Sequence, residues 1–106
     1  METYLHHVIL ISFNKDTSDI IKDEIIKKYK TLGEDCGGKS MGILFWSAQP
    51  NLDLRKNIHL VEIAIFKDQV SFESFKKHPK HVEVVELLKQ NADWYVGDVY
   101  EVFPKK

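Results

Sequence analysis

The sequence predicts an α+β domain in which six elements follow in the order β-α-β-β-α-β around a four-stranded antiparallel sheet, the split-βαβ or ferredoxin-like arrangement. Two observations support it: four short runs rich in β-branched and aromatic residues, and two stretches with helical periodicity, separated by turn residues. The 106 residues have the length of one domain, so we expect a single domain over residues 1–106.

The first strand and helix are expected within residues 5–32. Residues 5–13 are β-branched and apolar, which predicts a strand. Asp16 or Thr17 is suited to cap the following helix. Four apolar residues then recur at helical spacing: Ile21, Ile25, Tyr29 and Leu32. Gly33 is expected to end this helix.

The rest of the chain predicts two strands, an interrupted helix and a last strand. We expect strands over residues 41–47, 57–66 and 95–103, and helical segments over residues 71–77 and 81–90. A turn through Pro50 is expected over residues 48–56. Pro79 removes an amide and disfavours a helical conformation at His78, so the second helix should break there and restart.

The third strand is apolar on both faces. One face carries Ile58, Leu60, Glu62, Ala64 and Phe66, and the other carries His59, Val61, Ile63 and Ile65. Two helices can cover only one face of a four-stranded sheet, and an apolar face left in water favours association. A second copy of the chain is the simplest cover, which predicts a homodimer. The alternative is that the extra apolar residues lie at strand ends or under a loop.

Composition argues against several classes of partner. The formal net charge is −1 and Arg55 is the only arginine, so neither nucleic acid nor an anionic membrane is expected to bind. The longest apolar run, Val8 to Ile11, is far too short to span a bilayer. Residues 1–5 lack the features of a signal peptide, so we expect a cytoplasmic protein.

The single cysteine, Cys36, excludes an intramolecular disulfide. It lies in a glycine-rich segment beside Glu34 and Asp35, which we interpret as a flexible loop. Nearby acids raise a thiol pKa, so the residue is expected to be incidental rather than a nucleophile.

Five histidines suggest two kinds of chemistry. A metal site could combine His78 and His81 with an acid and with either His7 or His59. Zinc normally takes three or four protein ligands, and Pro79 breaks the spacing of the pair. We therefore expect no metal and no cofactor.

Acid–base chemistry is the second hypothesis. His81 could abstract a proton next to a carbonyl if Asp98, Tyr29 and His7 converge on it. The alternative is structural: His78 caps the restarted helix, and His81 is a partly buried hydrogen-bonding residue. The residues alone favour this alternative.

Two motifs resemble the stress-responsive dimeric α/β-barrel (Dabb) family. The strand from His7 to Phe13 is similar to that family's opening strand, and Phe75 to His81 contains its His-Pro-x-His segment. Asp98 stands where the family's last strand often has an aspartate. The resemblance covers residues 6–103. It implies a homodimer in which two four-stranded sheets form a barrel, a dimeric α/β barrel.

One branch of that family, olivetolic acid cyclase, cyclises a polyketide without a cofactor. The resemblance implies that His81 is the base, with Tyr29, His7 and Asp98 as its catalytic partners. The branch's second tyrosine falls on Phe75, which cannot donate a hydrogen bond. We place Phe75, His59 and His78 among the candidate ligand-binding residues, although His59 lies one residue further from His78 than the family pattern expects.

The sequence therefore predicts a homodimer that binds a small apolar or aromatic molecule, with enzymatic activity undecided. One alternative is a cofactor-independent cyclase, lyase or monooxygenase that uses His81 as general base. Another is a non-catalytic structural stress protein. An open cavity around Tyr29, His81 and Asp98 would favour the enzyme, and a filled one the structural protein.

Overall fold

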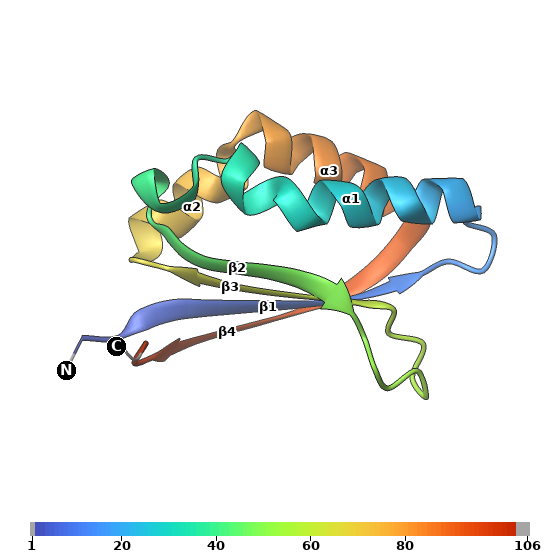
Figure 1. Ribbon diagram of the computed structural model, residues 1–106, viewed down its shortest axis with the longest axis horizontal. Coiled ribbons are helices and arrows are strands. Elements are labelled where there is room, and N and C mark those ends of the chain that lie inside the picture. Colours follow the sequence, from blue (N-terminus) through green and yellow to red (C-terminus); the bar gives the residue numbers. More distant parts are fainter. Residues whose placement is uncertain (1, 104–106) are drawn as a thin grey trace.

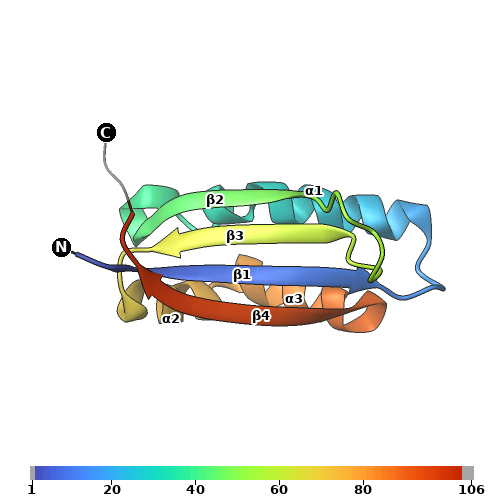
Figure 2. The same cartoon turned by 90° about the horizontal axis from the view of Figure 1, so that it is seen from below.

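The computed structural model describes residues 2–103 and contains a four-stranded antiparallel sheet with its helices on one face (Figure 1). The elements are β1 (Tyr4–Phe13), α1 (Asp19–Asp35), the short 3-10 helix η1 (Gly38–Met41), β2 (Ile43–Pro50), β3 (Leu60–Phe66), α2 (Gln69–Lys77), α3 (Pro79–Asn91) and β4 (Ala92–Glu101). The strands lie side by side in the order β2-β3-β1-β4 (Figure 2). This arrangement confirms the predicted ferredoxin-like order, with the second helix divided into α2 and α3.

The hairpin between β2 and β3 differs from the sequence prediction. β2 extends to Pro50, and its last residues pair with β3 rather than forming a turn. β3 begins at Leu60 instead of residue 57, because Asn57 takes a left-handed backbone with φ of 58° that an extended strand cannot include. The Asn51 side chain donates to the carbonyl of Ile58 and closes the loop.

The first helix also differs at both ends. Ser18, not Asp16 or Thr17, caps it by accepting a hydrogen bond from the Ile21 amide. Gly33 does not end the helix but lies inside it, where a Cβ atom would stand 2.7 Å from a ring carbon of Trp46. Glycine is needed at this position because β2 packs closely there, not because a helix stops.

The helix break at Pro79 is confirmed. His78 has extended backbone angles and joins the end of α2 to the start of α3, with Pro79 in the first helical turn. Its Nδ1 atom accepts a hydrogen bond from the Lys80 amide at 3.1 Å. The break therefore separates α2 from α3 and leaves α3 with its own N-terminal cap.

β4 begins at Ala92, three residues before the predicted start, and pairs with β1 along its whole length. The carbonyl of Asn91 accepts hydrogen bonds from the Asn14 amide and the Thr17 hydroxyl, both at 2.8 Å. These bonds hold the α3–β4 junction against the end of β1, so β4 begins directly after the last residue of α3.

The core lies between the helices and the sheet. Its fully buried side chains include Ile11, Ile25, Leu60, Phe66 and Leu88. Cys36 belongs to this core as the residue that ends α1, which corrects the expectation of a flexible loop. Burial raises the pKa of its thiol to about 11, with a smaller contribution from the charge of Asp35.

The face of the sheet away from the helices is apolar, as the sequence predicted. In the described part of the chain no helix covers it (Figures 1 and 2). Ile63 on this face is 40% exposed, whereas its neighbour Ala64 on the helix side is fully buried. Phe45, Tyr95 and Val99 are also exposed on the open face. Within residues 2–103 no helix is long and apolar enough to cross a membrane.

Candidate functional site

A cavity of about 300 Å³ lies between the sheet and the helical layer. Strands β1 and β4 line one side, and α1, α2 and α3 line the other. Its wall consists of His7, Ile9, Tyr29, Phe72, Phe75, Lys76, His81, Val85, Trp94, Val96 and Asp98. We call it the His81 cavity. It gathers the four candidate catalytic residues and Phe75 in one place.

His7, which is buried, and Asp98, which is partly exposed, form a pair on neighbouring strands. They stand directly opposite each other where β1 pairs with β4, and His7 Nδ1 lies 2.5 Å from Asp98 Oδ1. A carboxylate can only accept, so Nδ1 carries the proton and Nε2 keeps its lone pair when the ring is neutral. The ring packs against Phe72, with 4.9 Å between centroids. The pair is therefore fixed in position and tautomer.

His81 lies in the first turn of α3, just after the break. Its Nδ1 atom is 3.0 Å from the carbonyl oxygen of Lys76, and its ring lies 4.5 Å from that of Phe75. Because a carbonyl only accepts, Nδ1 carries the proton and Nε2 is left as a base. Burial lowers the pKa of His81, and the nearby His7 lowers it further, while the Lys76 carbonyl opposes them. His81 is thus neutral at pH 7 and able to accept a proton.

Tyr29 reaches the cavity from α1. Its hydroxyl is buried and has no hydrogen-bond partner among residues 2–103. Burial raises the pKa of the phenol, and an ionised Glu62 would raise it further, so the group is a donor rather than an anion. The indole of Trp46 donates to the Tyr29 carbonyl at 2.8 Å and holds this turn of α1 against β2.

Two of the candidate ligand-binding residues lie outside the cavity wall. His59 Nδ1 accepts a hydrogen bond from the Phe13 amide at 3.0 Å, and its ring stacks on Phe13, which ties the β2–β3 loop to β1. His78 caps α3, as the structural alternative predicted. Within residues 2–103 no group of three or more histidines, cysteines and acids is placed to hold a metal ion.

Glu62 is a buried acid next to the cavity wall that sequence reasoning did not single out. It lies on the helix side of β3, fully buried, and neither carboxyl oxygen has a hydrogen-bond partner in the described chain. Burial raises its pKa well above the usual value, and the charge of Asp98 adds to this. The available signal was a lone acid in the middle of an otherwise apolar strand face.

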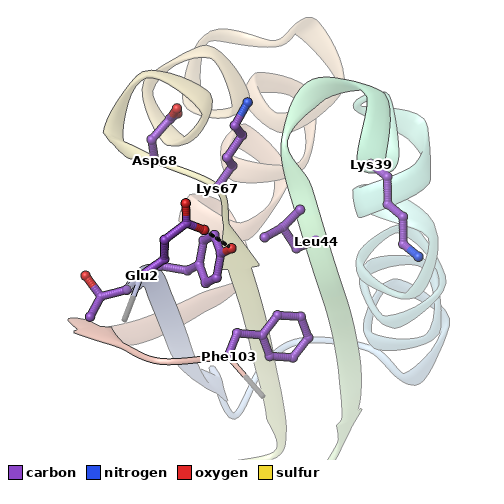
Figure 3. A pocket seen from close by; sticks show the side chains of 8 residues that line it. Glu2, Lys39, Leu44, Lys67, Asp68 and Phe103 are labelled. Carbon is purple, nitrogen blue, oxygen red and sulfur yellow. Dashed lines mark hydrogen bonds between the residues drawn. The ribbon is translucent and has the colours of Figure 1, made fainter. Parts of the chain in front are cut away.

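A second hollow, of about 560 Å³, opens at the end of the sheet where both termini lie (Figure 3). Leu44 and Phe103 contribute apolar surface, while Glu2, Lys67 and Asp68 contribute polar groups around it. Its lining contains no imidazole and none of the buried polar groups described above. The His81 cavity, although smaller, is therefore the better candidate for a functional site.

Several solved structures share this fold. A hydroxynitrile lyase from Passiflora edulis is 17% identical, with a TM-score of 0.79 over 98% of this chain and 100% of that chain. A Dabb family protein with a ferredoxin-like fold from Mesorhizobium loti is 12% identical, with a TM-score of 0.77 over 96% of this chain and 100% of that chain. A dimeric ferredoxin-like protein of unknown function from Thermobifida fusca is 14% identical, with a TM-score of 0.78 over 93% of this chain and 92% of that chain.

At these identities the likeness shows the fold alone. A sequence comparison with curated proteins gives no match. The profile of the Stress responsive A/B Barrel Domain, however, matches residues 5–101. That span includes both motifs on which the resemblance rested, the first strand and the His-Pro-x-His segment. The chain therefore belongs to the stress responsive A/B barrel domain (Dabb) family.

Proposed function

We propose that this chain binds a small apolar or aromatic molecule in the His81 cavity. The observation that carries the proposal is the wall of the cavity, where aromatic and aliphatic side chains surround a few convergent polar groups. A volume of about 300 Å³ is at the small end of the range for ligand sites. A purely structural domain would be expected to fill such a space with side chains.

Two matched variants test this binding. Val85 lines the cavity, whereas Val82 is exposed on the same helix. Acetophenone and its hydrocarbon analogue α-methylstyrene serve as probes, followed by protein-observed NMR. Both should shift resonances of cavity residues in the wild type and in Val82→Phe, and Val85→Phe should abolish the shifts. Absence of binding in the wild type would refute the proposal.

A second candidate function is cofactor-independent proton transfer, with His81 as general base. The neutral imidazole with a free Nε2, beside the fixed His7–Asp98 pair, favours it. A hydroxynitrile lyase shares the fold, which makes a lyase or cyclase the first reactions to assay. A carbon acid bound with its acidic proton toward Nε2 would lose it to His81, and Tyr29 could donate to the developing oxyanion.

Hydrogen–deuterium exchange separates this function from binding alone. Phenylacetone in D₂O exchanges protons next to its carbonyl, and the rate is followed by NMR. The wild type should accelerate the exchange, and His81→Ala should reduce that acceleration by about 10²–10⁴. His78→Asn, which keeps a helix cap outside the cavity, is the control. Equal rates for wild type and His81→Ala would exclude His81 as the base.

The same proposal includes a homodimer in which the open sheet faces of two copies pack together. The apolar side chains of that face support it, since a contiguous apolar face left in water favours association. Proteins of this fold from Thermobifida fusca and Bacteroides fragilis are described as dimeric. Sedimentation at micromolar concentration is the test, and a monomer there would refute the dimer.

A further inference from the structure

Two buried polar side chains between the sheet and the helices, one on β3 and one on α1, lack partners within residues 2–103. Both carboxyl oxygens of Glu62 and the hydroxyl of Tyr29 are shielded from solvent, and none has a hydrogen-bond partner within residues 2–103. Buried polar groups in folded proteins are nearly always hydrogen-bonded. Two exceptions on the same side of the sheet therefore indicate that something outside the chain satisfies them.

Tyr29 belongs to the wall of the His81 cavity, and Glu62 lies next to that wall. Tyr29 lines the cavity from α1, and Ile9 lines it from β1. Ile9 stands directly opposite Glu62 where β1 pairs with β3, and directly paired residues on one face have adjacent side chains. The Glu62 side chain consequently lies beside that of Ile9, next to the cavity wall. It is also close enough for its charge to affect the ionisation of Tyr29.

The surroundings of Glu62 favour the uncharged acid. The ionisable groups that line the cavity beside it are Tyr29 on α1, His7 on β1, Lys76 on α2, His81 on α3 and Asp98 on β4. His7 is already paired with Asp98, so it does not compensate a second carboxylate. On β2 the residue opposite Glu62 is Ala48. Burial and the charge of Asp98 raise the pKa of Glu62, which favours the protonated acid, a form that can donate a hydrogen bond.

We propose that Glu62, as an uncharged carboxylic acid, and Tyr29 form a pair of hydrogen-bond donors that holds the oxygen of a small neutral ketone, aldehyde or alcohol in the His81 cavity. A carbonyl or hydroxyl oxygen has two lone pairs, so one oxygen accepts from both donors. The inference rests on the proposed ligand binding and adds the chemical class of the ligand.

A cationic ligand is the main competing occupant, because an ionised Glu62 would attract an ammonium group. Such a ligand would lose its hydration in a wall that already contains Lys76 and two imidazoles, and the carboxylate of that wall, Asp98, is already paired with His7. The apolar side chains of Phe72, Phe75 and Trp94 offer it no acceptors. The cavity thus favours a neutral oxygen over a cation.

Three probes of nearly equal shape test the class of ligand. Acetophenone carries the carbonyl, α-methylstyrene replaces it with a methylene group, and 1-phenylethylammonium replaces it with a cation. Wild type should bind acetophenone about 3- to 10-fold more tightly than α-methylstyrene, as expected for one or two net hydrogen bonds. Glu62→Leu and Tyr29→Phe should each bring this ratio toward one, and Glu62→Gln, which keeps an N–H donor, should preserve most of it.

The outcomes separate the inference from the proposed binding. If both neutral probes bind the cavity equally well in the wild type, binding stands and the donor pair is refuted. If 1-phenylethylammonium binds best and loses that preference in Glu62→Leu, Glu62 is an anion and the inference is overturned. If no probe binds, both the proposed binding and the inference that rests on it are refuted.

A ligand-free measurement tests the charge state directly. The infrared carbonyl stretch of a protonated carboxyl group is separate from the bands of carboxylates. At pH 7 the wild type and Asp98→Asn should both show it, and Glu62→Gln should lack it. A wild-type spectrum without a protonated carboxyl at pH 7 would overturn the inference whatever the ligand results.

Discussion

His78 and His81 lie three residues apart and have different structural roles. His78 Nδ1 accepts from a backbone amide and caps α3, whereas His81 donates from Nδ1 to the carbonyl of Lys76 and lines the cavity. Pro79 makes this division possible, because it starts a new helix between them. In this chain the His-Pro-x-His segment therefore joins a helix cap to a cavity residue.

The cap of α3 gives a first prediction. His78→Ala should lower the free energy of unfolding by about 0.5–1 kcal/mol, because the Lys80 amide loses its acceptor. His78→Asn should keep wild-type stability, since asparagine is a good cap. Urea unfolding of both variants measures this. Weaker probe binding in both, with unchanged stability, would instead show that His78 contacts the ligand.

Glu62 gives a prediction with a pH dependence. Burial and the charge of Asp98 raise its folded-state pKa, so the folded chain keeps a proton that the unfolded chain releases above about pH 4.3. Stability from this group is full below that pH and is lost as the pH rises through the folded-state pKa. Glu62→Leu should remove this loss and increase stability at pH 7 by about 1–3 kcal/mol, because no polar group stays unpaired.

The measurement is urea unfolding from about pH 4 to pH 8, expressed as the difference between Glu62→Leu and the wild type. Other carboxylates contribute equally to both chains and cancel. The difference should grow with pH. A constant difference across this range would show that Glu62 is ionised in the folded chain.

At the scale of elements, α1 and β2 meet at an unusually close contact. Gly33 on α1 faces the indole of Trp46, which in turn donates to the Tyr29 carbonyl one turn earlier. Trp46 also packs on the ring of Phe75, with 5.5 Å between centroids. The position of Tyr29 over the cavity thus depends on the absence of a side chain at residue 33.

Gly33→Ala tests this contact. Alanine is the better helix former by about 1 kcal/mol, yet its Cβ atom would meet the rigid base of the indole. Overpacking typically costs about 1–3 kcal/mol, so the variant should be less stable despite its helix propensity. Thermal unfolding measures the change, and Gly33→Ala combined with Trp46→Leu should recover part of it. A stabilised single variant would contradict the close packing.

The element order could be predicted from the sequence because its signals are local. Pro79 marks the helix break, and the spacing of Ile21, Ile25 and Tyr29 marks α1. The ends of β2 and β3 could not be predicted from the sequence, because they depend on cross-strand register and on the backbone conformation of Asn57. Gly33 was misread for a similar reason: its role depends on a tryptophan 13 residues further along the chain.

The candidate site could also be predicted only in part from the sequence. The resemblance brought His7, Tyr29, His81 and Asp98 together because it carries three-dimensional information that spacing lacks. Glu62 was assigned to a strand face, but its burial became visible only when α1 was in place above it. His59 lies outside the cavity because β3 begins after it.

At the scale of the whole molecule, the open sheet face predicts how a dimer can be broken. Ile63→Lys should convert the dimer to a monomer that keeps its fold, because Ile63 lies on the open face. Ile20→Lys, at an exposed position on α1, should leave the dimer intact. Ala64→Lys should instead unfold the chain, since Ala64 is fully buried under the helices. Sedimentation and circular dichroism separate these results, and a dimeric Ile63→Lys would place the interface elsewhere.

The rate at which a reagent labels the buried thiol of Cys36 can report local opening of the helical layer. The residue ends α1 and its side chain is buried, so a thiol reagent reaches it only when the structure around the end of α1 opens. The labelling rate therefore reports the free energy of that local opening rather than of global unfolding. A molecule held in the neighbouring cavity should slow the label in proportion to its occupancy, which makes a single natural cysteine a site-specific gauge of binding.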